Sequence, residues 1–256
     1  MDYGLIGGRL GHSYSKGIHE KLADYSYELC PLTNDEFEPF MREHAFKAIN
    51  VTIPYKQRVI PFLDAMDPKA EAIGAVNTIV NRDGKLTGYN TDYDGFQYTL
   101  DKHGIDVKEK KVLILGNGGA AQAVKACVRD GGAREMILVR RSHDEECISY
   151  DEVFESHTDV DIIINTSPVG MFPEVDAQPI DLKPFTKCTA VLDLIYNPLV
   201  TKLTAQAEAL GMAGITGLEM LIAQAKVAVE IFLNTTIDDT KIEEIYRQML
   251  PELSHS

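Results

Sequence analysis

A lysine and an aspartate in the first hundred residues carry the side chains best suited to move a proton. Lys56 follows an apolar strand predicted over 46–53 that is ended by a proline. A lysine ammonium can protonate a developing alkoxide and take the proton back in the reverse direction. Asp92 could hydrogen-bond the reacting hydroxyl and pair with Lys56. The alternatives are a solvated lysine and a helix cap formed by Thr91 or Asp92.

Two serines and an asparagine in the same part of the chain could hold a small polar ligand. Ser13 and Ser15 are two residues apart in a loop that leads into a helix predicted over 16–23. Two hydroxyls near a helix N-terminus can bind a carboxylate without a full positive charge. Asn77 could present its amide to the pocket that holds Lys56 and Asp92. The alternatives are helix capping by the serines and an ordinary turn asparagine.

A glycine-rich turn in the middle of the chain is typical of a pyrophosphate site. Residues 112–115 form a short apolar run that predicts a strand buried on both faces. Gly116 permits a tight turn, Gly118 lets a phosphate approach the backbone, and Ala121 lets the next helix, predicted over 120–129, pack on the strand. The helix N-terminus adds free N–H groups and a favourable dipole. The alternative is an ordinary strand–helix turn whose glycines serve packing.

Two arginines indicate which dinucleotide the turn would bind. Arg140 and Arg141 follow a strand predicted over 136–139, where an NAD-binding chain usually carries an acid. A guanidinium can pair with a 2′-phosphate and stack on adenine, whereas an acid would repel the phosphate. The pair favours NADP over NAD. The alternative is two solvated surface arginines.

The order of the predicted elements indicates an α/β chain of two domains. Residues 1–104 alternate strands and helices, include a helix capped by Asn34, and contain a hairpin over 75–89 that suggests a mixed sheet. Residues 105–217 are predicted to form a doubly wound, Rossmann-type NADP-binding domain. The C-terminal helices, about 218–256, are expected to complete the first domain. A cleft between the two domains is the expected place of chemistry.

Composition restricts the class of protein. The chain has 256 residues, 45% of them hydrophobic and 25% charged, with a net charge of −14. This acidic balance argues against nucleic acid or an anionic membrane as a partner. We find no transmembrane run and no signal peptide, and the four scattered cysteines predict reduced thiols in a cytoplasmic protein. His12 and His19 lack the further ligands that a metal site needs, so no metal is expected.

The motifs, taken in order, resemble the shikimate dehydrogenase family over nearly the whole chain. The segments that carry the resemblance are Gly11-His12-Ser13-Tyr14-Ser15, Asn50-Val51-Thr52-Ile53-Pro54-Tyr55-Lys56, Gly74-Ala75-Val76-Asn77-Thr78, Gly88-Tyr89-Asn90-Thr91-Asp92, the glycine turn, Asn165-Thr166-Ser167-Pro168-Val169-Gly170-Met171, Asp193-Leu194-Ile195-Tyr196-Asn197-Pro198 and Gly217-Leu218-Glu219-Met220-Leu221-Ile222-Ala223-Gln224-Ala225.

The resemblance implies NADPH-dependent, reversible reduction of 3-dehydroshikimate to shikimate, a step of aromatic amino-acid biosynthesis. It implies that Lys56 is the acid/base, that Asp92 is its partner, and that Ser13 and Ser15 bind the substrate carboxylate. The residues implied to line the substrate ring are Thr52, Asn77, Asp92, Tyr196 and Gln224. Those implied to contact the cofactor are Gly116, Asn117, Gly118, Gly119, Ala120, Ala121, Arg140, Arg141, Leu194 and Gly217.

The chain departs from the family pattern at several positions. Lys16 replaces a common proline, Glu20 replaces a common asparagine, and the loop near Gly8 lacks the usual Asn-Pro pair. The adenosine-phosphate loop begins with Arg140 in place of asparagine, and Glu145 stands near the place of a later basic residue. These changes predict a rearranged phosphate clamp.

Two other functions are compatible with this layout. One is a quinate/shikimate dehydrogenase that uses NAD, although that class commonly has an acid where the arginines stand. The other is a non-catalytic regulator that senses NADP or a shikimate-like ligand, although such a protein would be expected to lose Lys56 and Asp92. The expected partner is a small-molecule substrate, and both a monomer and a homodimer are compatible with the sequence.

Overall fold

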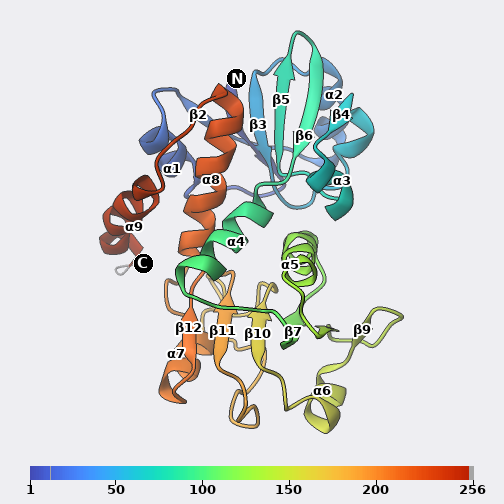
Figure 1. Ribbon diagram of the computed structural model, residues 1–256. Helices are drawn as coiled ribbons and strands as arrows, with labels where there is room; N and C mark the ends of the chain where they lie inside the picture. Colours follow the sequence, from blue (N-terminus) through green and yellow to red (C-terminus); the bar gives the residue numbers. More distant parts are fainter. Residues whose placement is uncertain (12, 254–256) are drawn as a thin grey trace. The chain divides into compact units, whose positions relative to one another are not determined.

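A computed structural model describes residues 1–11 and 13–253, which group into two compact α/β units (Figure 1). The first contains Met1–Gly95 with Leu221–Ile245, and the second contains Phe96–Met220 with Tyr246–Ser256. The predicted fold class is confirmed. The division by contacts passes through three helices, α4 (Asp92–Lys102), α8 (Leu218–Leu233) and α9 (Thr240–Leu253). It therefore differs from the predicted domain limits after residues 104 and 217, which stay a prediction.

The first unit is built on a mixed sheet with the strand order β2-β1-β3-β5-β6-β4. Strand β1 pairs in parallel with β2 and β3, whereas β3–β5 and β5–β6 are antiparallel. The β5–β6 hairpin turns at Asp83 and Gly84, both with positive φ, as the Asp-Gly pair predicts. The strands are β1 (Tyr3–Gly7), β2 (Tyr27–Pro31), β3 (Ala48–Val51), β4 (Ala65–Met66), β5 (Thr78–Arg82) and β6 (Lys85–Tyr89).

Helices cover both faces of this sheet. One apolar cluster joins Phe37 and Met41 of α2 to strand residues such as Ile49. A second joins Ala228 and Phe232 of α8 to other strand residues, Leu5, Tyr27 and Val80 among them. Helix α8 therefore packs on the first unit's sheet. The helices of this part are α1 (Ser15–Leu22), α2 (Asn34–Glu43), the short η1 (Ile60–Phe62), α3 (Pro68–Ile73) and α8 (Leu218–Leu233).

The cap of α2 differs from the prediction. Thr33, rather than Asn34, occupies the N-cap position, and its backbone N and hydroxyl donate to Glu36 at 2.8 and 2.7 Å. The Asn34 side chain accepts a hydrogen bond from Arg58 instead, at 2.5 Å. A threonine with a glutamate three residues later is the capping-box pattern, which explains the shift by one residue.

The second unit is built on a sheet with the order β12-β11-β10-β7-β8-β9, in which each described pair of strands is parallel. Strand β7 lies between β8 and β10, so the chain reverses its direction of winding beside β7. Open α/β sheets bind ligands at such a reversal, outside the carboxyl ends of the strands. The elements are β7 (Lys111–Leu115), α5 (Gly119–Asp130), β8 (Glu135–Val139), β9 (Cys147–Ile148), α6 (Tyr150–Ser156), β10 (Ile162–Asn165), β11 (Ala190–Asp193), α7 (Lys202–Ala209) and β12 (Ala213–Ile215).

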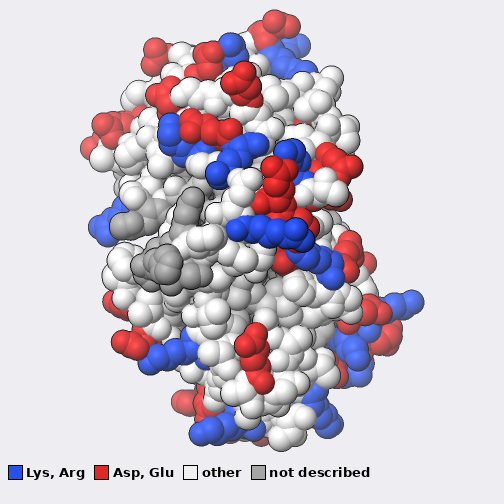
Figure 2. All heavy atoms as spheres, turned by 90° about the vertical axis from the view of Figure 1, so that its left-hand side faces the viewer, with Lys and Arg blue, Asp and Glu red and all other residues white. Residues whose placement is uncertain are grey.

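The charges of the molecule are mixed over the face that Figure 2 shows. Acidic and basic side chains lie side by side there, although acids outnumber bases by 39 to 25 in the sequence. The acidic surplus therefore does not gather into one patch on this face. Within the described part of the chain, no helix is both long enough and apolar enough to cross a membrane.

Candidate active site

Lys56 and Asp92 form an ion pair in the first unit. The Lys56 Nζ lies 2.6 Å from Asp92 Oδ2, and each side chain is only 12% exposed. Lys56 is placed by the turn after β3, in which Tyr55 N donates to Thr52 O at 2.9 Å and the Tyr55 ring stacks on Phe37. Lys56 is thus a positioned, largely buried cation rather than a solvated one.

Asn90 forms the cap that orients Asp92. Its Oδ1 accepts from the backbone N of Asp92 at 3.1 Å and of Tyr93 at 3.4 Å, and its Nδ2 donates to Ala75 O at 2.9 Å. Thr91 stands at the N-cap position, since its carbonyl accepts the first helical bond from Gly95 N at 3.0 Å, but the side chain that binds the first N–H groups is that of Asn90. Because Asn90 satisfies the first turn of α4, the Asp92 carboxylate pairs with Lys56. The sequence predicts a helix start near Asp94, two residues later than the observed start at Asp92, so Asn90 was too far away to be considered for this role.

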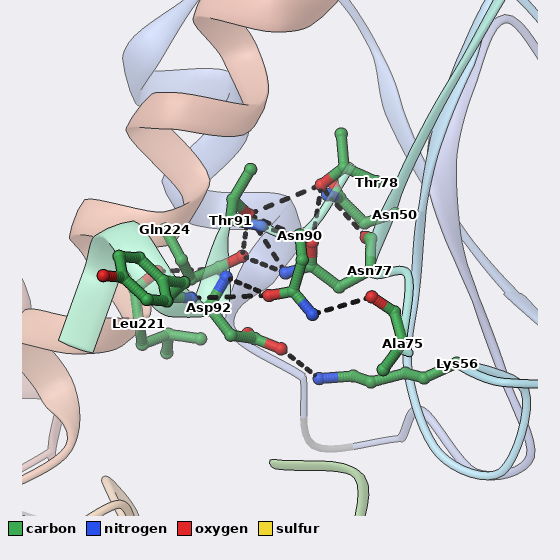
Figure 3. A network of polar contacts seen from close by, with 11 residues as sticks. Asn50, Lys56, Ala75, Asn77, Thr78, Asn90, Thr91, Asp92, Leu221 and Gln224 are labelled. Atoms are coloured by element: carbon green, nitrogen blue, oxygen red, sulfur yellow. Dashed lines mark hydrogen bonds and ion pairs between the residues drawn. The ribbon is translucent and has the colours of Figure 1, made fainter. Parts of the chain in front are cut away.

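Asn77 lies at the centre of a buried polar network beside this pair (Figure 3). Its Oδ1 accepts from Thr91 N at 2.8 Å and from Thr78 Oγ1 at 3.0 Å. Its Nδ2 points to Thr91 Oγ1 at 3.0 Å and to Gln224 Oε1 at 3.5 Å. The fold thus places Gln224 of α8 beside Asn77, although 147 residues separate them. Figure 3 shows Asn77 and Gln224 in the same close-up as the ion pair of Lys56 and Asp92.

Ser13, Ser15 and Thr52 follow two neighbouring strands of the first unit. The serines come after β1, Thr52 comes after β3, and these strands pair in parallel, so their carboxyl ends share one sheet edge. The two serine Oγ atoms are 3.1 Å apart, and Ser13 Oγ accepts from Ser15 N at 3.3 Å. Ser15 is the first residue of α1, and all three residues are partly buried. His12 of the same motif lies outside the described residues.

The glycine turn of the second unit has the shape that a phosphate needs. Gly116 has φ of +102°, and a Cβ there would lie 2.8 Å from Thr166 Oγ1. Gly118 is the N-cap residue of α5, and nothing described lies within 4 Å of the position of its missing Cβ. Ala121 is fully buried where α5 packs. A glycine with positive φ that closes the turn and a second glycine that leaves it open fit a bound pyrophosphate.

The side chains around this turn are already engaged. Asn117 donates to Glu146 at 3.0 Å and accepts from Gln122 and Lys125. Arg140 Nη1 lies 2.6 Å from Asp144 Oδ2. Arg141 is exposed, and Gly119 and Ala120 form the first turn of α5. The sequence did not indicate that acids of this chain would hold Asn117 and Arg140.

Leu194 and Gly217 meet at the carboxyl ends of β11 and β12. Gly217 N donates to Ile195 O at 2.9 Å, and a Cβ on Gly217 would lie 2.1 Å from Leu194 O, so only glycine fits. Tyr196 lies in the same loop after β11 and belongs to the second unit.

Asp193, which the sequence did not single out as functional, anchors the loop that carries Leu194 and Tyr196. It is 1% exposed, and burial raises the pKa of its carboxyl to about 6. Its oxygens accept from Thr201 at 2.7 Å and Asn165 at 3.0 Å. The loop is therefore tied to both β10 and α7.

A mixed α/β unit with a buried Lys–Asp pair and a parallel α/β unit with a dinucleotide turn define a class of protein, the two-part dehydrogenases that use a nicotinamide dinucleotide. Comparison with known proteins narrows this class. Residues 5–79 match the family model described as the shikimate dehydrogenase substrate binding domain. A protein of Clostridium perfringens (strain SM101 / Type A) called shikimate dehydrogenase (NADP(+)) is 37% identical over 96% of this chain and 97% of its own.

Solved structures agree with this result. A chorismate mutase/shikimate 5-dehydrogenase fusion protein from Clostridium acetobutylicum matches with a TM-score of 0.92 and 35% identity, covering 99% of this chain and 98% of its own. Shikimate 5-dehydrogenase from Thermus thermophilus, in complex with NADP(H) and shikimate, matches with a TM-score of 0.87 and 29% identity, covering 98% and 100%. The chain therefore belongs to the shikimate dehydrogenase family.

Proposed function

We propose that this chain catalyses the NADPH-dependent, reversible reduction of 3-dehydroshikimate to shikimate. The observation that carries the proposal is the largely buried pair of Lys56 and Asp92, placed next to the amides of Asn77 and Gln224. Relatives named NADP-dependent shikimate dehydrogenases match nearly the whole chain, which supports the same reaction here.

The proton of the reaction passes through Lys56. As the carbonyl carbon is reduced, the Lys56 ammonium donates a proton to its oxygen, which becomes the new hydroxyl, and solvent then returns a proton to the amine. Asp92 holds the ammonium at this point through the 2.6 Å contact and accepts a hydrogen bond from the hydroxyl. In the reverse direction Lys56 takes the proton away.

Neutral side chains would position the substrate. Ser13 and Ser15 bind its carboxylate through their hydroxyls at the start of α1, and Thr52 follows the neighbouring strand at the same sheet edge. Asn77 and Gln224 bind ring hydroxyls. Their amides can exchange hydrogen bonds with hydroxyl groups, as they already do with the hydroxyl of Thr91. Tyr196 is included as a further substrate-binding residue because the family resemblance implies this role.

The second unit would hold NADP. Bound NADPH supplies the hydride, and the protein supplies its position. Gly116 to Ala121 take the pyrophosphate at the turn and at the start of α5, where none of the described side chains caps the helix. Arg140 and Arg141 take the 2′-phosphate, and Leu194 and Gly217 contact the nicotinamide end.

The test is the rate of nicotinamide reduction with purified protein in four parallel assays, with shikimate or quinate and with NADP⁺ or NAD⁺. We expect the rate with shikimate and NADP⁺ to exceed the other three clearly. Comparable rates with NAD⁺ or quinate would instead assign the chain to the broad-specificity quinate/shikimate dehydrogenases. Absence of turnover in all four assays, with NADP⁺ binding retained, would identify a ligand-sensing regulator.

Cytoplasmic location and action on small molecules complete the proposal. None of the described cysteines Cys30, Cys127, Cys147 and Cys188 is in a disulfide, which suits a reducing compartment. The reaction needs a small-molecule substrate and NADP, and involves neither nucleic acid nor a membrane. Both a monomer and a homodimer are compatible with it.

A further inference from the structure

The segment between β8 and β9 of the second unit ends in three consecutive acids, Asp144, Glu145 and Glu146. Glu146 reaches across to the glycine turn. Its Oε2 accepts from Asn117 Nδ2 at 3.0 Å and lies 3.7 Å from Lys125 Nζ. An amide N–H and an ammonium are the donors that a phosphate oxygen prefers. The carboxylate of Glu146 thus occupies donors beside the site proposed for the cofactor phosphates.

Lys125 is directed to this place by the geometry of α5. Side chains on a helix lean toward its N-terminus, so a residue in the second turn can reach the first. Lys125 Nζ also lies 3.2 Å from Asn117 Oδ1, and its side chain is only 19% exposed. The ammonium is therefore held at the turn, and Glu146, at 66% exposed, is the partner of the pair that solvent reaches more easily.

A second acid fixes the segment in this position. Asp144 Oδ1 accepts from the backbone N of Glu146 at 2.9 Å and of Cys147 at 2.8 Å, and these two bonds, together with Arg140, keep the pKa of Asp144 below its usual value. Its other oxygen is 2.6 Å from Arg140 Nη1. The same short segment therefore contacts Arg140, Asn117 and Lys125. Arg140 and Asn117 are among the residues proposed to bind NADP.

We infer that Glu146 lowers the affinity of the site for its cofactor by competing with a cofactor phosphate for Asn117 and Lys125. NADP then binds by displacing the Glu146 carboxylate, and the affinity of the site is set below what its donors alone would allow. The inference rests on the proposed function. The opposite interpretation is that Glu146 stabilises the turn in the conformation that binds the nucleotide. Removal of the Glu146 charge would then weaken NADP binding, whereas under the inference it strengthens NADP binding.

The test is isothermal titration calorimetry of the full chain with NADP⁺, and separately with inorganic pyrophosphate, for the wild type, Glu146→Gln and Glu145→Gln. The glutamine at 146 keeps an acceptor for Asn117 but removes the charge. Glu145→Gln is the matched control, since it removes the same charge one residue away, at an exposed side chain outside these contacts among the described residues. Circular dichroism of each variant checks that it is folded.

We expect Glu146→Gln to bind NADP⁺ about threefold to tenfold more tightly than the wild type, and Glu145→Gln to change affinity by about twofold at most. Raised salt should shrink the gain, because it screens exposed charges. Equal effects of the two variants, or weaker binding by Glu146→Gln, would overturn the inference. Failure of the wild type to bind NADP⁺ would remove the proposed cofactor. The pyrophosphate series would then decide the inference: tighter binding by Glu146→Gln alone supports it, and any other pattern, including no binding, overturns it.

A double-mutant cycle adds a second readout. Lys125→Met should weaken NADP⁺ binding more in the Glu146→Gln background than in the wild type, because in the wild type the ammonium is already shared with a carboxylate. Additive effects would overturn the inference, because they would show that Glu146 does not compete with the phosphate for Lys125.

Discussion

Replacement of Asn90 tests whether the start of α4 is what holds Asp92 toward Lys56. Asn90 is 3% exposed and makes two kinds of bond, one to the first N–H groups of the helix and one to the carbonyl of buried Ala75. Asn90→Ala removes both, whereas Asn90→Ser keeps a hydroxyl that can cap the helix but does not reach Ala75. The two variants therefore separate the contribution of the bonds to the helix N–H groups from that of the bond to Ala75.

The magnitude follows from the bonds that are lost. A lost N-cap costs about 0.5–2 kcal/mol, and a buried carbonyl left without its donor costs about 1–3 kcal/mol. Asn90→Ala should therefore lower the free energy of local opening by about 2–4 kcal/mol, and Asn90→Ser by about 1–3 kcal/mol. Loss of the fixed first turn releases Asp92 from Lys56, so we also expect kcat to fall by about tenfold in the alanine variant, equivalent to about 1.4 kcal/mol.

The measurement is hydrogen–deuterium exchange of peptides that cover 90–100, because the expected loss of stability is local to the start of α4. Steady-state kinetics with shikimate gives kcat, and calorimetry gives the affinity for NADP⁺, which should not change. Wild-type exchange and wild-type kcat in Asn90→Ala would refute the reasoning. A serine variant as impaired as the alanine variant would assign the whole effect to the Ala75 link.

Further predictions concern the acid/base, the glycine turn and a buried histidine. Lys56→Ala should lower kcat by about 10²–10⁴-fold with NADP⁺ binding intact, and unchanged turnover would remove Lys56 from the mechanism. Gly118→Ala, which adds a methyl in open space at an ordinary φ, should weaken NADP⁺ binding in calorimetry without lowering the melting temperature, whereas Gly116→Ala should lower both because of its positive φ and the contact with Thr166. Burial lowers the pKa of His19 from 6.5 to about 3, so the unfolded state binds more protons between these values. The contribution of neutral His19 to the free energy of unfolding should therefore be complete above pH 6.5. It should fall as the solution is acidified, by about 2 kcal/mol at pH 5. Urea titrations of wild type and His19→Gln at pH 5 and 8 should show this slope only in the wild type, and equal slopes would refute the assignment.

Features that depend on residues close together in the chain could be predicted from the sequence. Gly116, Gly118 and the strand before them predict the nucleotide turn, because turn geometry and buried strands depend on a few neighbouring residues. The Asp-Gly pair at 83 predicts the hairpin in the same way. The order of motifs along the chain was enough to indicate the family, which the comparisons confirm.

Features that join distant parts of the chain were decided by the tertiary structure. Gln224 lies beside Asn77 because α8 packs on the first unit's sheet, and no local pattern encodes that contact. The Asn90 side chain binds the first N–H groups of α4 and also reaches the carbonyl of Ala75, which belongs to an earlier loop of the chain. Such partners are chosen by topology and by side-chain geometry together. The residue types therefore show which chemistry is available, while the packing of the chain selects which of those residues meet.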